Sequence, residues 1–141
     1  MTFQFRELTR ADSATIVPLA NKLHPEIDAA TFGGYLAAMF DYPTFHCFGL
    51  FQGDVLVAVT NGWITVRFYS GKQLEVDNVV VDPGLRSQGV GKLFFEGIQA
   101  WAEANDCKTI ELNTYVANSK SHKFYFNEGY KILGFHFQKV L

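Results

Sequence analysis

The sequence predicts an α/β fold: a mixed, mostly antiparallel sheet of six to seven strands, with about four helices divided between its two faces. Apolar segments of strand length dominate the first half of the chain, and an amphipathic helical segment lies between two strands in the second half. A strand, a crossover helix and a further strand form a β-α-β unit, so the sheet is expected to be mixed. The 141 residues, 48% of them hydrophobic, suit one domain with one core, spanning 1–141.

The first third of the chain is expected to hold one strand and two helices. Residues Phe3–Leu8 alternate between apolar and polar side chains, which predicts a strand. A helix over Thr9–Leu23 would begin with a capping box completed by Asp12, and Pro18 must kink or shorten it. A second helix is expected over Asp28–Phe40.

Three strands should follow. Phe45–Gln52 and Val55–Val66 are predicted to form a hairpin joined at Gly53-Asp54, and a turn at Ser70-Gly71 leads into a strand over Gln73–Val81.

The second half is predicted to alternate helices with strands. A helix over Gly89–Asn105 has an apolar stripe at helical spacing, made by Val90, Phe94, Ile98 and Trp101. A strand is expected over Thr109–Val116. A short helix would begin at an Asn118 N-cap and end before Gly129 as its C′ residue, and a last strand is expected over Tyr130–Val140.

Composition and charge exclude several classes of function. The net charge is −2 and no run of Lys or Arg exceeds two, which argues against binding of nucleic acid or membranes through a basic surface. The N-terminus lacks the apolar region of a signal peptide, so we expect a cytoplasmic protein in which Cys47 and Cys107 are reduced, buried thiols. The histidines show no metal-ligand spacing, so no metal is expected: they are His24, His46, His122 and His136.

The segment Arg86–Gly91 (RSQGVG) is the main candidate for a binding site. It connects a hydrophobic strand to the start of a helix, where unpaired amides and the helix dipole attract anions. Gly89 and Gly91 remove side chains that would block a close approach, and Arg86 adds a cation. A pyrophosphate would suit this site, although a turn with an N-cap would explain the same glycines.

Two common nucleotide motifs do not match this loop. A Walker A motif would need Lys directly after Gly89, and a dinucleotide-binding motif would need Gly at position 94, where Phe94 stands. Instead, Arg86–Gly91 resembles the Arg/Gln-x-x-Gly-x-Gly/Ala signature of the GNAT superfamily of N-acetyltransferases. A second block, Asn118 through Phe124-Tyr125 to Gly129-Tyr130, resembles another motif of that family, with Ser121 in place of the usual Ala.

The resemblance implies the GNAT fold and acetyl-CoA as co-substrate. Acetyl-CoA would lie between the strands Gln73–Val81 and Thr109–Val116, with its pyrophosphate on the loop amides. The residues implied in its binding are Val79, Val80, Val81, Arg86, Ser87, Gln88, Gly89, Val90, Gly91, Lys92, Asn118, Ser121 and Tyr125. Asn118 has two compatible roles, as helix N-cap and as a contact to CoA.

The strand that precedes the loop has an irregular pattern. Leu74 and Val76 are expected to face one way and Glu75 and Asp77 the other, after which the apolar parity shifts at Asn78. A β-bulge near Asn78 would produce the shift, and a fully buried strand end would explain it as well.

Acetyl transfer to an amine needs a base, oxyanion donors and an acid. An alkylamine with a pKa of about 10.4 must lose a proton before it attacks a thioester. By resemblance Glu75 is the expected base, directly or through water, and Asp77 on the same face could share or replace it. Both could instead recognise the substrate ammonium or lie on a solvated sheet face. The Val79 amide is the expected oxyanion donor and Tyr125 the expected acid toward the thiolate, unless Tyr125 is a packed core aromatic.

The predicted function is transfer of an acetyl group to a small primary amine, by direct attack in a ternary complex. The C-terminal stretch resembles that of aminoalkylphosphonate and aminoglycoside acetyltransferases. Acetylation of a protein Lys or N-terminus, and a CoA-binding module without catalysis, are the alternatives. The resemblance also makes a homodimer possible.

Overall fold

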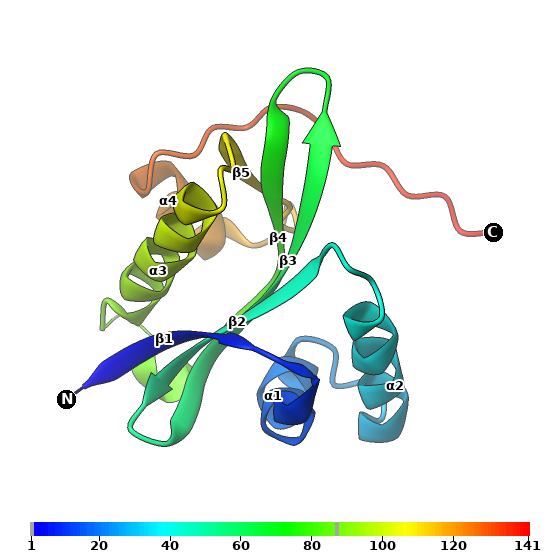
Figure 1. Cartoon of the computed structure of the whole chain (residues 1–141), viewed down its shortest axis with the longest axis vertical. Coiled ribbons are helices and arrows are strands. Elements are labelled where there is room, and N and C mark those ends of the chain that lie inside the picture. Colours follow the sequence, from blue (N-terminus) through cyan, green and yellow to red (C-terminus); the bar gives the residue numbers. More distant parts are fainter. Residues whose placement is uncertain (1, 87) are drawn as a thin grey trace. The chain divides into compact units, whose positions relative to one another are not determined.

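The computed structural model describes residues 2–86 and 88–141. The chain divides into two compact units, Met1–Glu111 and Leu112–Leu141, and each is treated by itself below. Figure 1 traces the elements along the chain.

A five-stranded mixed sheet runs through the structure, with its strands side by side in sequence order. The strands are β1 (Phe3–Leu8), β2 (Phe45–Gln52), β3 (Val55–Arg67), β4 (Gly71–Val81) and β5 (Thr109–Leu112). The first four are joined by antiparallel pairing. The predicted β2–β3 turn is present, with Gly53 at φ 59°, and β1 to β4 begin and end close to the expected residues.

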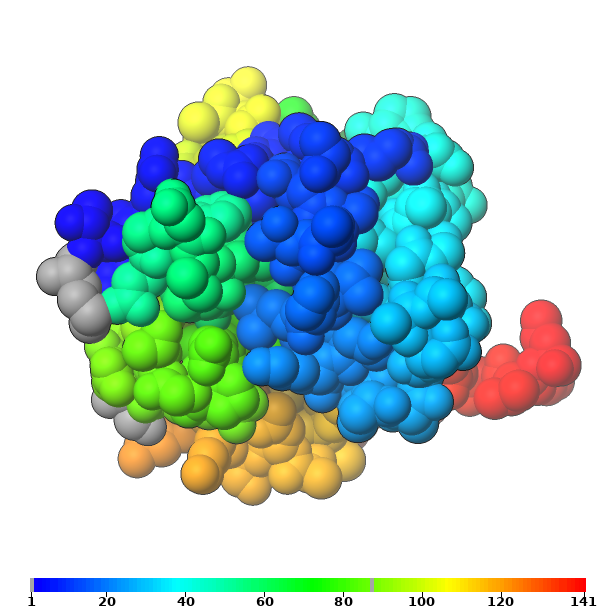
Figure 2. Space-filling model, turned by 90° about the horizontal axis from the view of Figure 1, so that it is seen from below, coloured from blue at the N-terminus to red at the C-terminus, as the bar shows by residue number. Residues whose placement is uncertain are grey.

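Helices cover both faces of the sheet in the first unit. α1 (Ser13–Ala20) and α2 (Ala29–Phe40) contact each other on one face, where Figure 2 shows them side by side in blue to cyan. α3 (Val90–Ala104) lies on the opposite face (Figure 1). The core beneath α1 and α2 is built from apolar side chains of both layers, including Ile16, Leu19, Leu36, Cys47, Leu56, Val59 and Val80.

The predicted helix over Thr9–Leu23 is correct in place and wrong in its continuity. A 3-10 turn at Arg10–Asp12 precedes α1, and another at Asn21–Leu23 follows it. Pro18 explains the shortening, because it has no N–H to bond to the carbonyl of Ala14 one turn earlier.

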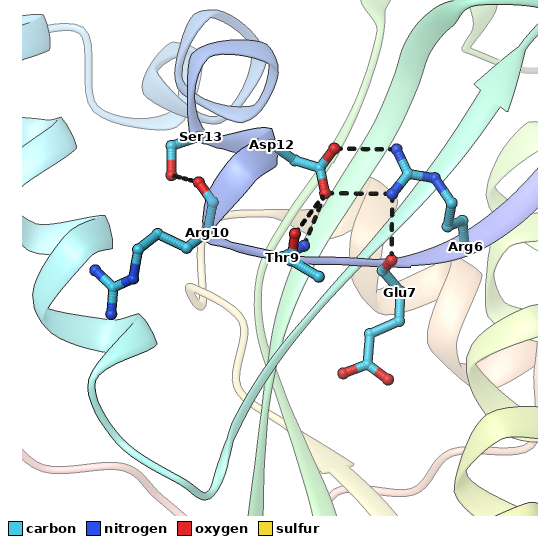
Figure 3. Close-up of polar contacts among 6 residues, drawn as sticks. All are labelled: Arg6, Glu7, Thr9, Arg10, Asp12 and Ser13. Atoms are coloured by element: carbon cyan, nitrogen blue, oxygen red, sulfur yellow. Dashed lines mark hydrogen bonds and ion pairs between the residues drawn. The ribbon is translucent and has the colours of Figure 1, made fainter.

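The capping box at the start of this segment is present (Figure 3). The Asp12 carboxylate accepts the Thr9 N–H at 2.8 Å, which satisfies an amide at the entrance of the helix. The Arg6 guanidinium donates to both Asp12 carboxylate oxygens, at 3.1 and 3.2 Å. This pairing with Arg6 lowers the pKa of Asp12 and attaches β1 to the start of α1.

The apolar stripe of α3 seats the helix on the sheet. Val90, Phe94 and Ile98 are buried as expected, and Trp101 is half-buried. Gly97 lies against the ring of Phe5, so that a Cβ at this position would come within 2.4 Å of the ring. The close approach of α3 to β1 therefore depends on the missing side chain.

Replacing Gly97 with Ala should destabilise the fold by about 1–3 kcal/mol, because an added methyl overpacks this contact. Gly34→Ala is the matched control, since nothing lies within 4 Å of its Cβ position in α2. There the better helix propensity of Ala should raise the free energy of unfolding by about 0.5–1 kcal/mol. Urea denaturation of both variants measures the difference, and equal effects would contradict the packing argument.

The second unit contains α4 (Ser119–Asn127), which begins and ends as predicted. Asn118 Oδ1 accepts the Ser121 N–H at 3.3 Å, so Asn118 is the N-cap. Gly129 at φ 91° is the C′ residue of a Schellman motif, in which the Tyr130 N–H donates to the Tyr125 carbonyl at 2.9 Å.

The predicted count of six to seven strands is wrong, because the described residues form five. The segment 130–141 contains no strand, and its residues from Lys131 onward are exposed. β5 also ends at Leu112 rather than at Val116. An alternating pattern supplies side chains for a strand but not the neighbouring strand that its backbone needs.

Candidate functional site

A β-bulge interrupts the pairing of β3 with β4. Val59 pairs with Val80 and Asn61 with Asp77, so that the single residue Thr60 faces both Asn78 and Val79. Asn78 has φ 54°, a left-handed conformation that Asn tolerates better than most residues. The bulge predicted near Asn78 is therefore confirmed.

Side chains and backbone of the bulge hold one another in place. The buried Thr60 hydroxyl donates to the Asp77 carbonyl at 2.7 Å, and the Asn78 N–H donates to Asp77 Oδ1 at 3.0 Å. A bulge leaves part of the strand ladder without its usual pairing, and this exposes backbone groups to a ligand. Val79, the expected oxyanion donor, lies in this part of β4.

The bulge also decides which side chains share a face of β4. Leu74 and Val76 are 0% and 2% exposed, with Glu75 and Asp77 opposite them, as predicted. Because of the extra residue, Val80 joins the Glu75 face and packs in the core under α1 and α2. Val79 and Val81 are half-buried.

The Glu75 carboxylate is held by two neighbours that sequence analysis missed. Arg67 Nη2 donates to Glu75 Oε1 at 2.7 Å, and Gln73 Nε2 donates to the same oxygen at 3.2 Å. The Gln73 side chain is fully buried and accepts a bond from the Ser70 hydroxyl at 2.6 Å. The expected end of β3 at Val66 left Arg67 outside the hairpin, although extending the pairing from the Ser70-Gly71 turn would have placed it near Glu75.

The segment after β4 turns sharply into α3. A 3-10 turn, Pro83–Leu85, is capped by Asp82, whose Oδ1 accepts the Gly84 N–H at 2.9 Å. Gln88 Nε2 donates to the Gly84 carbonyl at 3.3 Å and closes the loop. Ser87, one of the predicted CoA contacts, lies outside the described residues.

The start of α3 is open to a ligand. Gly89 is the N-cap at φ 76°, and nothing lies within 4 Å of the position that its Cβ would take. The first amides of an α-helix, here those of Val90 and Gly91, have no acceptor within the helix. Arg86 and Lys92 have exposed side chains on either side. The geometry of this part fits an anionic group such as a pyrophosphate.

The second unit carries the remaining predicted site residues, Asn118, Ser121 and Tyr125. The Tyr125 ring lies edge-on to those of Phe124 and Tyr130, with centroids 5.5 and 5.6 Å away. Burial raises the pKa of Tyr125 to about 12, so its phenol keeps its proton throughout the neutral range.

A cavity of about 200 Å³ lies beside the bulge, and sequence analysis did not find it. Its walls come from α1, α2 and the segment between them, and its floor comes from β3 and β4. It is lined by Ile16, Ala20, Leu23, His24, Ile27, Phe32, Tyr35, Leu36, Met39, Val59, Asn61 and Asn78. One signal in the sequence could have indicated this cavity. Two polar residues, Thr60 and Asn61, interrupt the apolar run of β3, and a strand that contacts only the hydrophobic core would not need them.

Both cysteines are free thiols. Cys47 is buried as predicted, and burial raises its pKa to about 12, whereas Cys107 is only half-buried because it follows the exposed end of α3. Among the residues that the structure describes, no three His, Cys, Asp or Glu side chains are grouped as metal ligands would be. In the same residues, no helix has the length and apolarity needed to cross a membrane.

Comparisons with known proteins agree with this geometry. The family described as acetyltransferase (GNAT) matches residues 14–130. An aminoalkylphosphonate N-acetyltransferase of Salmonella typhimurium is 26% identical over 98% of this chain and 91% of its own. An uncharacterized N-acetyltransferase of Bacillus subtilis, YhdJ, is 24% identical over 95% of this chain and 96% of its own.

Solved structures show the same fold. The aminoglycoside N-acetyltransferase AAC(6')-Iy in complex with CoA superposes with a TM-score of 0.86 at 15% identity, covering 99% of this chain and 95% of its own. A ribosomal-protein-alanine N-acetyltransferase of Brucella melitensis superposes with a TM-score of 0.83 at 16% identity, over 99% and 100% of the two chains. With the family match over most of the chain, these findings show that the chain belongs to the GNAT family of acetyltransferases.

Proposed function

We propose that this acetyltransferase moves the acetyl group of acetyl-CoA to the primary amine of a small molecule, by direct attack in a ternary complex. The observation that carries the proposal is the continuity of the segment from Glu75 to Gly91. One strand presents a carboxylate, then a bulge with accessible backbone, and then an open helix N-terminus. An acyl donor with a pyrophosphate at its far end needs such features in that order.

Acetyl-CoA, when bound, supplies the activated thioester. The amides from Arg86 to Gly91 would hold its pyrophosphate, with Arg86 and Lys92 as nearby cations. Backbone groups of Val79, Val80 and Val81 would position the pantetheine arm. Contacts of Asn118 and Ser121 with CoA remain part of the proposal.

The residues of β4 would serve the attacking amine. An amine that is protonated at neutral pH needs a base, and Glu75 takes this role because Arg67 and Gln73 fix its carboxylate. Asp77, on the same face, is the second candidate. The Val79 amide, within the bulge, would donate to the developing oxyanion.

Tyr125 would donate a hydrogen bond to the departing sulfur. Its phenol is protonated at neutral pH, which this role requires. The proposal for Tyr125 rests on its place in the family motif.

The relatives suggest the first acceptors to test. Two of the similar proteins bear the names aminoalkylphosphonate and aminoglycoside N-acetyltransferase, so amines of both classes belong in a substrate panel. A similar solved structure bears the name ribosomal-protein-alanine N-acetyltransferase. Protein N-termini and Lys side chains are therefore the second class of acceptor to test.

We also propose a cytoplasmic protein that forms a homodimer. The segment 130–141 supports the dimer, because the exposed apolar side chains of Phe135 and Phe137 alternate with the polar His136 and Gln138. A second copy of the chain would supply the neighbouring strand that such a segment needs. Sedimentation equilibrium of the full chain tests this, and a monomer at high concentration would contradict it.

A thiol-release assay tests the activity. The chain is incubated with acetyl-CoA and a panel of small amines, lysine peptides and peptides with free N-termini, and free CoA is measured. We expect release that depends on a small amine. Tight binding of CoA without turnover on any acceptor would instead support a binding module without catalysis.

The glycine at the start of α3 gives a specific test of the pyrophosphate site. Gly89→Ala should weaken acetyl-CoA binding by about tenfold, because Ala in a left-handed conformation costs about 1–2 kcal/mol and its Cβ enters the open space above the helix. Gly53→Ala is the matched control, with a similar positive φ and nothing within 4 Å in the β2–β3 turn. Calorimetric titration with CoA should separate the two variants, and equal affinities would refute the assignment.

A further inference from the structure

The cavity beside the bulge has an uneven distribution of polar groups. Its floor carries two side-chain amides, Asn61 on β3 and Asn78 in the bulge. Its helical walls are mainly apolar, with Ile16, Phe32 and Leu36 among them. A molecule that fills this space would therefore direct its polar end toward the bulge and its apolar body between the helices.

Charges that could recognise a polar acceptor are scarce in this cavity. Among the described residues that line it, none is Lys, Arg, Asp or Glu. The histidine on its rim, His24, already places Nδ1 3.1 Å from the Glu26 carboxylate. A phosphonate would need cations here, and a multiply charged aminoglycoside would need carboxylates, because a desolvated charge without a partner is costly.

One polar group on the floor suits an amine. Asn61 is 9% exposed, and its Nδ2 lies 3.6 Å from the sulfur of Met39, which is a weak acceptor. With the amide nitrogen turned toward sulfur, the carbonyl oxygen is left to accept from a donor in the cavity. An ammonium or amine N–H is such a donor, and at this place it lies beside the bulge.

The size of the cavity restricts the apolar body. An apolar cavity of about 150 Å³ holds a benzene molecule. About 200 Å³ therefore accommodates one aromatic ring with a short arm, or a branched alkyl group of similar volume.

From these features we infer that the acceptor is a monoamine with one compact apolar group, of the arylalkylamine class, bound with its ring between α1 and α2 and its amine at Asn61. This inference rests on the proposed acetyltransferase function and narrows its substrate class. The amine then lies on the side of the bulge that faces α1 and α2, where Glu75 and Asp77 also lie.

The test compares binding and turnover. 2-Phenylethylamine, ethanolamine, 2-aminoethylphosphonate and an aminoglycoside are titrated into the chain saturated with CoA, and the same amines are assayed with acetyl-CoA. We expect kcat/KM and affinity for 2-phenylethylamine to exceed those for the other three by about tenfold or more, the amount that a well-filled apolar pocket discriminates. Binding without any turnover would support the cavity assignment and contradict the catalytic proposal. Absence of 2-phenylethylamine binding, or a preference for the phosphonate or the aminoglycoside, would overturn the inference.

Three variants test where the ring binds. Leu23→Glu puts a carboxylate into the cavity from a side chain that is already 40% exposed, and it should weaken 2-phenylethylamine binding by about tenfold or more. Val66→Glu adds the same charge at the 78% exposed end of β3, outside the cavity lining, and should leave this affinity unchanged. Leu23→Ala, which adds no charge, should weaken binding in the same direction by a smaller factor. Unchanged affinity in both Leu23 variants would overturn the placement.

Discussion

Glu75→Gln should lower kcat by about 100-fold or more at pH 7, with the loss shrinking as the pH rises. In the proposed function, Glu75 would be the base that removes the ammonium proton. The glutamine keeps the size of the side chain and an Oε1 atom to accept from Arg67 and Gln73, so the fold and the local geometry should persist.

The dependence on pH follows from the chemistry of the amine. An alkylamine has a pKa of about 10.4, so below that value the fraction of free amine rises about tenfold per pH unit. With a base present, the wild-type rate needs little free amine in solution and changes slowly with pH. The variant must wait for free amine, so its log kcat/KM should rise with a slope near one between about pH 7 and 10.

Asp77→Asn is the matched control for this experiment. Asp77 lies two residues away on the same face of β4, and its carboxylate accepts the N–H of Asn78 in the bulge. If Glu75 is the base, the Asn variant should keep the flat profile of the wild type. A steep profile for Asp77→Asn and a flat one for Glu75→Gln would transfer the role to Asp77.

The β4 strand is also where the sequence predicted most. The parity of Leu74 and Val76 against Glu75 and Asp77, followed by its reversal, required either a bulge or a buried strand end, and the register with β3 shows the bulge. Local rules sufficed there because side chains alternate strictly along a strand. Local rules also sufficed at the ends of α4, where short-range hydrogen bonds decide the structure. The sequence there predicted Asn118 as the N-cap and Gly129 as the C′ residue.

What the sequence did not predict depends on contacts between elements. Ile16 and Leu36 could be assigned to helices, but periodicity states that a residue is buried and not that space is left beside it. The cavity follows from how α1 and α2 pack over β3 and β4. The link between Arg67 and Glu75 likewise depends on the length of the β3–β4 hairpin. The prediction of a strand over Tyr130–Val140 was wrong, because a strand-like local pattern does not decide whether the backbone forms a strand.

Tyr125→Phe should lower kcat by about 10- to 100-fold and change the affinity for acetyl-CoA little. The reason lies in the phenol's pKa of about 12, which burial raises from the usual value near 10. A thiol has a pKa of about 8.5, so complete proton transfer from this phenol to a thiolate would be uphill by about 5 kcal/mol. In the proposed function, Tyr125 would therefore donate a hydrogen bond to sulfur as charge develops, and a bond to a charged group contributes about 1.5–3 kcal/mol.

Tyr130→Phe provides the control, because Tyr130 packs against Tyr125 and burial raises its pKa to about 12 as well. Both phenols keep their protons in the fold above the pH at which they lose them in the unfolded chain. The stability contributed by each is therefore fully present below about pH 10 and is lost as the pH rises toward 12. Urea denaturation at pH values from about 10 to 12 should show that each variant loses less unfolding free energy than the wild type. The size of this difference should be similar in the two variants.

Only the Tyr125 variant should change kcat, since Tyr130 has no place in the proposed chemistry. The wild-type rate should also lack an alkaline decline from Tyr125 below about pH 11, because a phenol with a pKa of about 12 stays protonated there. Equal kcat for Tyr125→Phe and the wild type, with the expected stability change present, would make Tyr125 a packing residue and leave the thiolate to depart without a donor from α4.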